Sequence, residues 1–296
     1  MKQLVVISGK GGTGKTTLVA SFAALAEGKV LADCDVDAAD LFLLLEPKIK
    51  EKGDFYGGRK PEVDEGRCTG CGICTELCRF NAIQDGKVDY VDCEGCGLCA
   101  LACPEEAIRM VEALSGWWYR AETKNGPMVY AQLKIGEENS GKLVAEVRER
   151  AKGVAEGKGL VIIDGPPGIG CPVISSITGA DLALVVTEPS ASGLHDLERA
   201  VGLCRHFQVP VKVCINKFDI NPSKTKEIEE YCKREGIEVV GKITFDRKVI
   251  EALVEGKSPL EYPTAAREEI ERVWERVKGA LFPQGGGDDR KGGAAP

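Results

Sequence analysis

The sequence predicts an α/β fold: a doubly wound, mostly parallel sheet with helices on both faces and one small cysteine-rich module inserted into it. Three observations support this class. Short apolar runs alternate with amphipathic stretches, most of the runs lack an apolar-polar alternation, and the pattern is interrupted once. Strands covered by helices on both faces need no polar face, so continuous apolar runs favour a parallel sheet.

The elements follow in order along the chain. Six apolar runs are the strand candidates: 3–8, 29–33, 159–164, 182–187, 211–216 and 238–243. Seven amphipathic segments are the helix candidates: 15–26, 38–45, 140–156, 192–207, 223–235, 247–255 and 264–281. The last of these has one apolar stripe that includes Trp274 and Val277, which predicts a helix docked on the core.

The α/β pattern stops at about residue 53 and resumes after about residue 135. Because it resumes, we expect an insert rather than a terminal domain. We therefore predict an α/β domain formed by 1–52 and 113–283, an insert at 53–112 and a flexible Gly-rich tail at 284–296. The Asn-Gly pair within "GWWYRAETKNGPMVYAQL" predicts a hairpin directly after the insert.

Composition limits the function. With 296 residues and 43% apolar content the chain can bury a large core. No apolar run approaches the roughly 20 residues that span a bilayer and no leader opens the chain, so we expect a cytoplasmic protein without stable membrane insertion. The net charge is −7 and no Lys/Arg cluster is present, which argues against nucleic acid as a partner. Residues 54–112 hold twelve acids and six bases, a net −6, which would attract a partner protein with a basic docking face.

A phosphate-binding loop lies between the first strand and the first helix. "GKGGTGKT" at 9–16 fits G-x-x-x-x-G-K-[ST] in the required strand–loop–helix context. Glycines let backbone N–H groups turn toward phosphates, and the helix N-terminus favours an anion. We expect Lys15 to contact the β- and γ-phosphates and Thr16 to bind Mg²⁺. The nucleotide-binding candidates are Gly9, Gly11, Gly12, Thr13, Gly14, Lys15, Thr16 and Thr17.

Two further polar residues follow apolar runs. Asp164 ends "LVIID" before "GPPG", at the strand edge where ligands of open α/β sheets bind, so we expect it to hold Mg²⁺ through water and to begin a switch loop. Asn216 in "CINKFD" is a candidate for contacting the nucleotide base. N-K-x-D is also the signature of guanine-binding proteins, so this motif alone does not distinguish adenine from guanine as the base. A plain turn residue is the other interpretation of Asn216.

The cysteine segment carries the sharpest spacing. Two runs of C-x2-C-x2-C-x3-C begin at Cys68 and Cys93, the spacing of bacterial two-cluster ferredoxins, in which the fourth cysteine of each run ligates the other cluster. This resemblance implies a ligand set for each of two 4Fe–4S clusters: Cys68, Cys71, Cys74 and Cys103 for cluster one, and Cys93, Cys96, Cys99 and Cys78 for cluster two. Structural zinc is the alternative, although it needs no third evenly spaced cysteine. Arg79 stands where a proline is usual and removes no ligand.

"KGGTGKTT" closely resembles the deviant phosphate loops of the MinD/ParA/Mrp and nitrogenase iron protein group. The resemblance implies that Lys10 reaches the partner's nucleotide in an ATP-bound homodimer, and it favours adenine over guanine. In "ADCDVDAAD", Asp35 matches the residue that orients or activates the attacking water, while Asp33 and Asp37 would support Mg²⁺ and the loop. The alternatives are a solvated loop charge for Lys10 and a helix N-cap for Asp37.

Five cysteines remain outside the two runs. Four lie in strand or helix candidates and are predicted to pack as apolar residues: Cys34, Cys204, Cys214 and Cys232. Cys171 follows Asp164 at the offset where the nitrogenase iron protein places a cluster ligand. That protein uses two cysteines per chain and residues 134–144 offer none, so we expect no shared third cluster. A redox-sensitive or metal-passing thiol and simple packing stay open for Cys171.

Over nearly its full length the chain resembles the MinD/Mrp-type (SIMIBI class) P-loop ATPases, here with an inserted two-cluster ferredoxin module. This implies ATP/ADP, Mg²⁺ and two 4Fe–4S clusters as cofactors, and slow, partner-stimulated ATP hydrolysis that uses Lys10, Lys15, Asp35 and Asp164. We expect a nucleotide-gated electron-transfer dimer with a redox acceptor protein. The alternatives are an iron–sulfur carrier of the Mrp type, which would use a late C-x-x-C pair that this chain lacks, and a MinD/ParA-like positioning ATPase with a cluster sensor.

Overall fold

A computed structural model describes residues 1–137, 140–157 and 159–283, so the predicted tail at 284–296 lies outside the described residues. One sheet has the strand order β11-β10-β9-β1-β8-β2-β7-β6-β3. The strands from β11 to β7 are parallel, whereas β6 is antiparallel to both of its neighbours. All six predicted strands are present. The bounds are β1 (Lys2–Ser8), β2 (Lys29–Asp33), β3 (Lys48–Val63), β6 (Ile108–Thr123), β7 (Gly126–Leu133), β8 (Leu160–Pro167), β9 (Leu182–Thr187), β10 (Val211–Asn216) and β11 (Glu238–Ile243).

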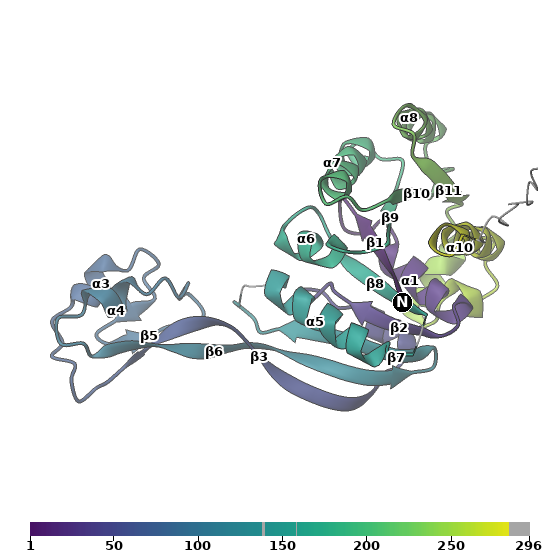
Figure 1. Cartoon of the computed structure of the whole chain (residues 1–296). Coiled ribbons are helices and arrows are strands. Elements are labelled where there is room, and N and C mark those ends of the chain that lie inside the picture. The colour runs from purple at the N-terminus through teal and green to yellow at the C-terminus, as the bar shows by residue number, and fades with distance from the viewer. Residues whose placement is uncertain (138–139, 158, 284–296) are drawn as a thin grey trace, which may run out of the picture.

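Helices cover both faces of the sheet (Figure 1). Helices α5 to α8 pack on one face, and α1, α2 and α10 pack on the other. The bounds are α1 (Lys15–Leu25), α2 (Leu41–Leu45), α5 (Ser140–Val154), α6 (Cys171–Ile177), α7 (Gly193–His206), α8 (Pro222–Arg234), α9 (Arg247–Val254) and α10 (Arg267–Leu281), with a 3₁₀ turn at Pro259–Glu261. Two predictions need correction. The helix expected from residue 38 begins only at Leu41, and the short α6 was not predicted.

The core explains why the apolar runs form the central strands. Leu4, Val5, Val6 and Ile7 of β1 are fully buried, so both faces of this strand are covered. Burying a side chain of this size stabilises a fold by about 1.5–3 kcal/mol. The predicted stripe of α10 docks on the core, where Trp274 packs 5.1 Å from Phe22 between ring centroids.

The four cysteines predicted to pack as apolar residues are all buried: Cys34, Cys204, Cys214 and Cys232. Burial raises the pKa of Cys204 and of Cys214 to about 12. These thiols therefore stay protonated at neutral pH and behave as small apolar groups.

A long two-stranded ribbon connects the sheet to the cysteine segment. β3 and β6 pair from Lys48↔Glu122 to Val63↔Ile108, and the far part of the ribbon extends beyond the sheet to a separate lobe (Figure 1). The predicted hairpin is confirmed between β6 and β7, with Gly126 at φ +113°. The expected insert limits at 53 and 112 fall inside β3 and β6, so hydrogen-bonded strands cross both limits.

The lobe contains α3 (Ile73–Leu77), α4 (Leu98–Ala102) and a small hairpin of β4 (Ile83–Gln84) and β5 (Lys87–Val88). Lys60 of β3 joins it to the body, because its Nζ donates to the Tyr90 carbonyl at 2.8 Å and lies 3.1 Å from Glu137 Oε1. The Lys60 and Glu137 side chains are only 9% and 11% exposed. The lobe is therefore held by this buried contact as well as by the ribbon.

In the ranges that the structure describes, no helix combines the length and the apolar character needed to cross a bilayer.

Candidate functional site

The phosphate-binding loop joins β1 to α1. Gly14 holds the N-cap position of α1 at φ 93°, and Gly12 has φ 76°. These left-handed angles favour glycine. At Gly14 a Cβ would also lie 2.4 Å from Asn216 Nδ2, so no side chain fits there. The predicted phosphate contacts from Gly9 to Thr17 thus lie in one loop and the first turn of α1.

Asp164 faces this loop from the neighbouring strand β8. The residue is 1% exposed, and its Oδ1 has no hydrogen-bond partner among the described residues. Burial raises its pKa to about 7, although the charge of Lys15 and a hydrogen bond from Thr16 act in the opposite direction. A buried carboxylate oxygen without a partner is costly unless a cation approaches it. Asp164 and Thr16 are therefore suitably placed to hold Mg²⁺ together.

The segment after β2 is held by Asp33. Its two carboxylate oxygens accept from the backbone N–H groups of Asp35 at 3.1 Å and Leu41 at 3.2 Å. Asp33 is fully buried, and both contacts tie the loop to the end of β2. Burial raises the pKa of Asp35, while the charge of Lys15 lowers it. Asp35 thus lies within the electrostatic reach of the phosphate-binding lysine.

The N-cap alternative for Asp37 is wrong. Helix α2 begins at Leu41 with Asp40 in the N-cap position, and the Asp37 side chain is exposed. The hydrogen bonds that the Asp33 carboxylate accepts from Asp35 N and Leu41 N keep residues 34–40 in a loop, so the helix starts later than predicted.

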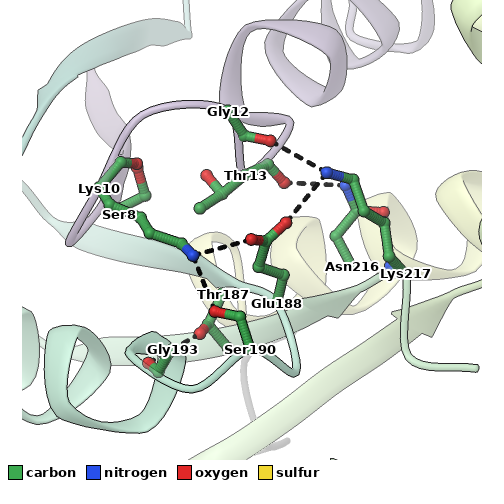
Figure 2. Close-up of polar contacts among 10 residues, drawn as sticks. All are labelled: Ser8, Lys10, Gly12, Thr13, Thr187, Glu188, Ser190, Gly193, Asn216 and Lys217. Carbon is green, nitrogen blue, oxygen red and sulfur yellow. Dashed lines mark hydrogen bonds and ion pairs between the residues drawn. The ribbon is translucent and has the colours of Figure 1, made fainter. Parts of the chain in front are cut away.

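Glu188 holds two lysines against the phosphate-binding loop (Figure 2). Lys10 Nζ lies 2.8 Å from Glu188 Oε1 and donates to Ser190 Oγ at 2.7 Å. Lys217 Nζ lies 2.9 Å from Glu188 Oε2 and donates to the Gly12 carbonyl at 3.1 Å. Burial alone would raise the pKa of Glu188, but the two lysines lower it overall. Lys10 is therefore paired within its own chain, and its predicted contact with a partner's nucleotide stays a prediction.

Asn216 touches the same loop. Its Nδ2 donates to the Thr13 carbonyl at 2.8 Å, and its Oδ1 accepts from Lys217 N at 3.0 Å (Figure 2). Asn216 also borders a cavity of about 230 Å³ that opens between the phosphate-binding loop and the segment that includes Phe245 and Ile270. The cavity is next to the loop, so Asn216 is placed where a nucleotide base could reach it, and its contact with the base stays a prediction.

Sequence reasoning missed Glu188, Ser190 and Lys217. Glu188 follows β9 directly, and β9 pairs with β1 beside the phosphate-binding loop. The rule that singled out Asp164, a polar residue at the carboxyl end of a parallel strand, applies equally to Glu188. Lys217 follows the candidate Asn216 and has φ 56°, an uncommon left-handed conformation for a lysine.

The eight lobe cysteines line two pockets. We call the pocket lined by Cys68, Cys71, Cys74 and Cys103 site one. We call the pocket lined by Cys78, Cys93, Cys96 and Cys99 site two. These are the same crossed sets that the ferredoxin spacing implies. The site two pocket has a volume of about 270 Å³ and the site one pocket only about 20 Å³, so a bulky group at site one requires its loop to widen.

Backbone N–H groups point at three of these sulfurs. Ala82 N donates to Cys78 Sγ at 3.4 Å, Gly95 N to Cys93 Sγ at 3.4 Å and Ala107 N to Cys103 Sγ at 3.3 Å. Such donors stabilise a thiolate. Within the described ranges, no group of three or more His, Cys, Asp or Glu side chains is placed to hold a single metal ion. Thiolate donors in two sets of four nevertheless fit the donor chemistry of iron–sulfur clusters.

Cys171 is exposed at the first residue of α6, where the loop after Asp164 ends. Its Cβ would lie 3.3 Å from a Cβ built on Gly141 of α5. Packing in the core therefore does not account for Cys171.

Comparisons with known proteins identify the family of the nucleotide-binding domain. Residues 4–260 match the CobQ/CobB/MinD/ParA nucleotide binding domain family model. The uncharacterized protein MJ0578 of Methanocaldococcus jannaschii is 36% identical over 222 residues, 74% of this chain and 79% of that protein. An iron–sulfur cluster carrier protein of Pyrococcus horikoshii is 31% identical over 106 residues, 31% of this chain and 35% of that protein.

A solved structure shares the fold. The septum site-determining protein MinD of Pyrococcus horikoshii, complexed with Mg-ADP, has a TM-score of 0.56 at 17% identity and covers 93% of this chain and 95% of that chain. The fold, the glycine loop with Lys15, and the match over residues 4–260 together place this chain in the CobQ/CobB/MinD/ParA family of nucleotide-binding proteins.

Proposed function

We propose that this protein binds and hydrolyses ATP as a homodimer and that its nucleotide state controls electron transfer through two 4Fe–4S clusters in the lobe. One observation carries the proposal: two pockets divide the eight cysteines into the crossed sets of four, on a lobe that continuous strands join to the nucleotide-binding body. Family membership supports nucleotide binding, and the cysteine sets support the redox part.

In the nucleotide site, the backbone of 11–16 and Lys15 bind the phosphates. Thr16 and Asp164 would hold Mg²⁺, which supplies positive charge to the phosphate oxygens. Asp35 orients the attacking water from the loop that Asp33 fixes. The related MinD structure is described with Mg-ADP, which supports the same ligand class here.

Lys10 makes the site sensitive to a second copy of the chain. Glu188 and Ser190 hold its ammonium within its own chain. The phosphates of a nucleotide on a partner subunit are stronger acceptors for this ammonium than one shared carboxylate. We infer that ATP-dependent dimerisation moves Lys10 from Glu188 to the partner's nucleotide, and that hydrolysis stays slow until a redox partner engages the dimer.

In the lobe, sites one and two would each bind a cluster, which supplies a one-electron store. Gly95 is in the left-handed conformation at φ 66°, and its backbone N–H donates to Cys93 Sγ at 3.4 Å. The net charge of −6 over residues 54–112 would attract an acceptor protein with a basic docking face.

Two alternatives each have one observation in their favour. Partial similarity to an iron–sulfur cluster carrier protein supports a carrier that transfers clusters. The shared MinD fold supports a positioning ATPase in which the cysteine sites act as a sensor. Two complete sets of four cysteines favour retained clusters, so electron transfer remains the primary proposal.

The test uses the full chain purified without oxygen. Iron and acid-labile sulfide are measured, and the protein is then incubated with MgATP, with MgADP or without nucleotide. One assay uses protein whose clusters have first been reduced with dithionite and then freed of excess reductant, and it follows electron transfer from the clusters to a one-electron acceptor dye. Another assay follows cluster transfer to an apo-ferredoxin. ATP-dependent dye reduction with retained iron supports the proposal, and Lys15→Ala should abolish the dependence. Iron loss to the apo-ferredoxin would favour the carrier, and a chain without iron or sulfide would refute the redox proposal.

A further inference from the structure

We propose that Arg79 and Glu105 give the two cysteine sites unequal reduction potentials, with the higher potential at site two. The inference rests on the proposed clusters and deepens that function, because it assigns a direction to electron movement within the lobe. It is carried by the geometry of an internal repeat and by the charges that line each site.

The repeat provides a matched comparison within one chain. Residues 68–83 and 93–108 align without gaps, "CTGCGICTELCRFNAI" with "CEGCGLCALACPEEAI". Their backbones agree closely: Asn81 and Glu106, at equivalent positions, have φ 53° and 47°. The fourth cysteines accept equivalent bonds, from Ala82 N at 3.4 Å and from Ala107 N at 3.3 Å. These two bonds are therefore nearly equal, while site two also has the bond from Gly95 N to Cys93 Sγ at 3.4 Å, which acts in the same direction as the charges described next.

The charges around the sites differ. Because the fourth cysteine of each run crosses to the other site, the residues that follow it cross too. Arg79 and Phe80 line site two, whereas the equivalent Pro104 and Glu105 line site one. The charged residues of the linings are Arg79 and Glu94 at site two, and Asp85 and Glu105 at site one. Site two therefore has one charge of each sign, and site one has two negative charges.

Charge of this kind acts directly on a reduction potential. Adding an electron makes an anionic cluster more negative, so a nearby cation favours reduction and a nearby carboxylate opposes it. The Arg79 guanidinium lies 4.7 Å from the centre of the Phe80 ring, which keeps it beside the site. Arg79 and Glu105 are both exposed, so salt will reduce the difference without reversing it.

The order of the sites along the ribbon gives the difference a direction. Pro61 of β3 lines site two, while Val63, the last residue of β3, and Ile108, the first of β6, line site one. Site one therefore lies at the tip of the lobe and site two lies closer to the nucleotide-binding body. An electron accepted at the tip from a one-electron donor protein would pass to site two, reducing site two as site one is reoxidised.

The experiment is an anaerobic redox titration of the full chain, followed by electron paramagnetic resonance. We expect two one-electron transitions. Arg79→Gln should lower the higher potential, Glu105→Gln should raise the lower one, and Arg79→Lys should restore the wild-type value. Arg109→Gln is the matched control, because it removes an exposed cation of the same lobe that lines neither site.

Each outcome decides the inference. Three results would overturn it while leaving the proposed function intact. The two cluster signals could have equal potentials, Arg79→Gln could shift the lower transition instead of the higher one, or Arg109→Gln could shift a potential as much as Arg79→Gln does. A protein with no cluster signal would overturn both. Repeating the titration at high salt should bring the two transitions closer together.

Discussion

Lys10 and Glu188 form an ion pair within one chain, with Lys10 Nζ 2.8 Å from Glu188 Oε1. The other oxygen of Glu188 binds Lys217, so one carboxylate restrains two cations beside the phosphate-binding loop. If Lys10 acts on a partner's nucleotide, as the proposed function requires, this ion pair must open before the dimer closes.

Removing the charge of Glu188 should favour the dimer. In Glu188→Gln, Lys10 loses its ionic partner, and a partly exposed pair of this kind contributes up to about 1 kcal/mol. We expect the ATP concentration at half-dimerisation to fall by about two- to fivefold, measured by sedimentation velocity. Glu235→Gln, which breaks the surface pair with Arg205, is the control and should leave the value unchanged. A higher ATP requirement in Glu188→Gln would show that Glu188 assists closure instead.

Mg²⁺-dependent nucleotide binding should depend on pH through Asp164. Its pKa of about 7 in the free chain lies above the ordinary value because of burial, so the carboxyl is mainly protonated below pH 7 and ionised above it. Because Mg²⁺ requires the carboxylate, the affinity for MgADP should be about tenfold lower at about pH 6 than at about pH 8. Titration calorimetry measures this directly. Asp164→Asn should bind MgADP weakly with a flat profile, and a flat profile in the wild type would exclude Asp164 as a titrating ligand.

The raised pKa of Asp164 should also make the stability of the protein depend on pH when no nucleotide is present. The folded-state pKa of Asp164 is above its unfolded value, so the folded chain binds the extra proton. The contribution of this group to the free energy of unfolding should therefore decrease as pH rises from about 4 to about 7. Urea unfolding at several pH values should show a smaller decrease in Asp164→Asn. Equal pH dependence in both proteins would contradict the assignment.

The crossing of the cysteine runs can be tested with paired substitutions. Cys78→Ser with Cys93→Ser removes two ligands of site two alone, so the chain should keep about half of its iron. Cys78→Ser with Cys68→Ser removes one ligand from each site, and the chain should lose nearly all of it. Iron content after anaerobic reconstitution distinguishes the two variants. The reverse ranking would mean that each run binds its own cluster.

The buried Lys60–Glu137 contact should hold the lobe against the body. Breaking a buried pair leaves one uncompensated charge, which costs about 3–5 kcal/mol. We expect Glu137→Gln to lower the free energy of unfolding by roughly this amount and to speed proteolysis of the ribbon. Glu62→Gln, which breaks the exposed pair with Arg109, should cost less than about 1 kcal/mol. Equal costs for the two variants would show that the contact is unimportant.

The central strands and the glycine loop could be predicted because local sequence determines them. Continuous apolar runs such as that of β1 need two covered faces, and Gly14 is required by its own backbone angle. The start of the ribbon could not be predicted. Lys48 to Lys52 are mostly charged and form a strand only because β6 pairs with them, with Lys52 Nζ 4.8 Å from the centre of the Trp117 ring.

The pairing of strands that are distant in the sequence also explains why Glu188 and Lys217 were not predicted as site residues. Glu188 and Lys217 meet Lys10 and Gly12 only after β9 and β10 take their places in the sheet. The resemblance to two-cluster ferredoxins, by contrast, implied which cysteines would share a pocket, because in those proteins the fourth cysteine of each run ligates the other cluster. Spacing alone did not show that Arg79 and Glu105 would line different sites.

The most direct test of coupling between nucleotide and lobe is an anaerobic redox titration monitored by electron paramagnetic resonance. The full chain is titrated with ATP, with ADP and without nucleotide, with Lys15→Ala as the control for phosphate binding. The account predicts that ATP shifts the potential or the line shape of at least one cluster signal in the wild type and not in Lys15→Ala. Identical potentials and spectra in all three states, in a protein shown to bind ATP, would contradict it.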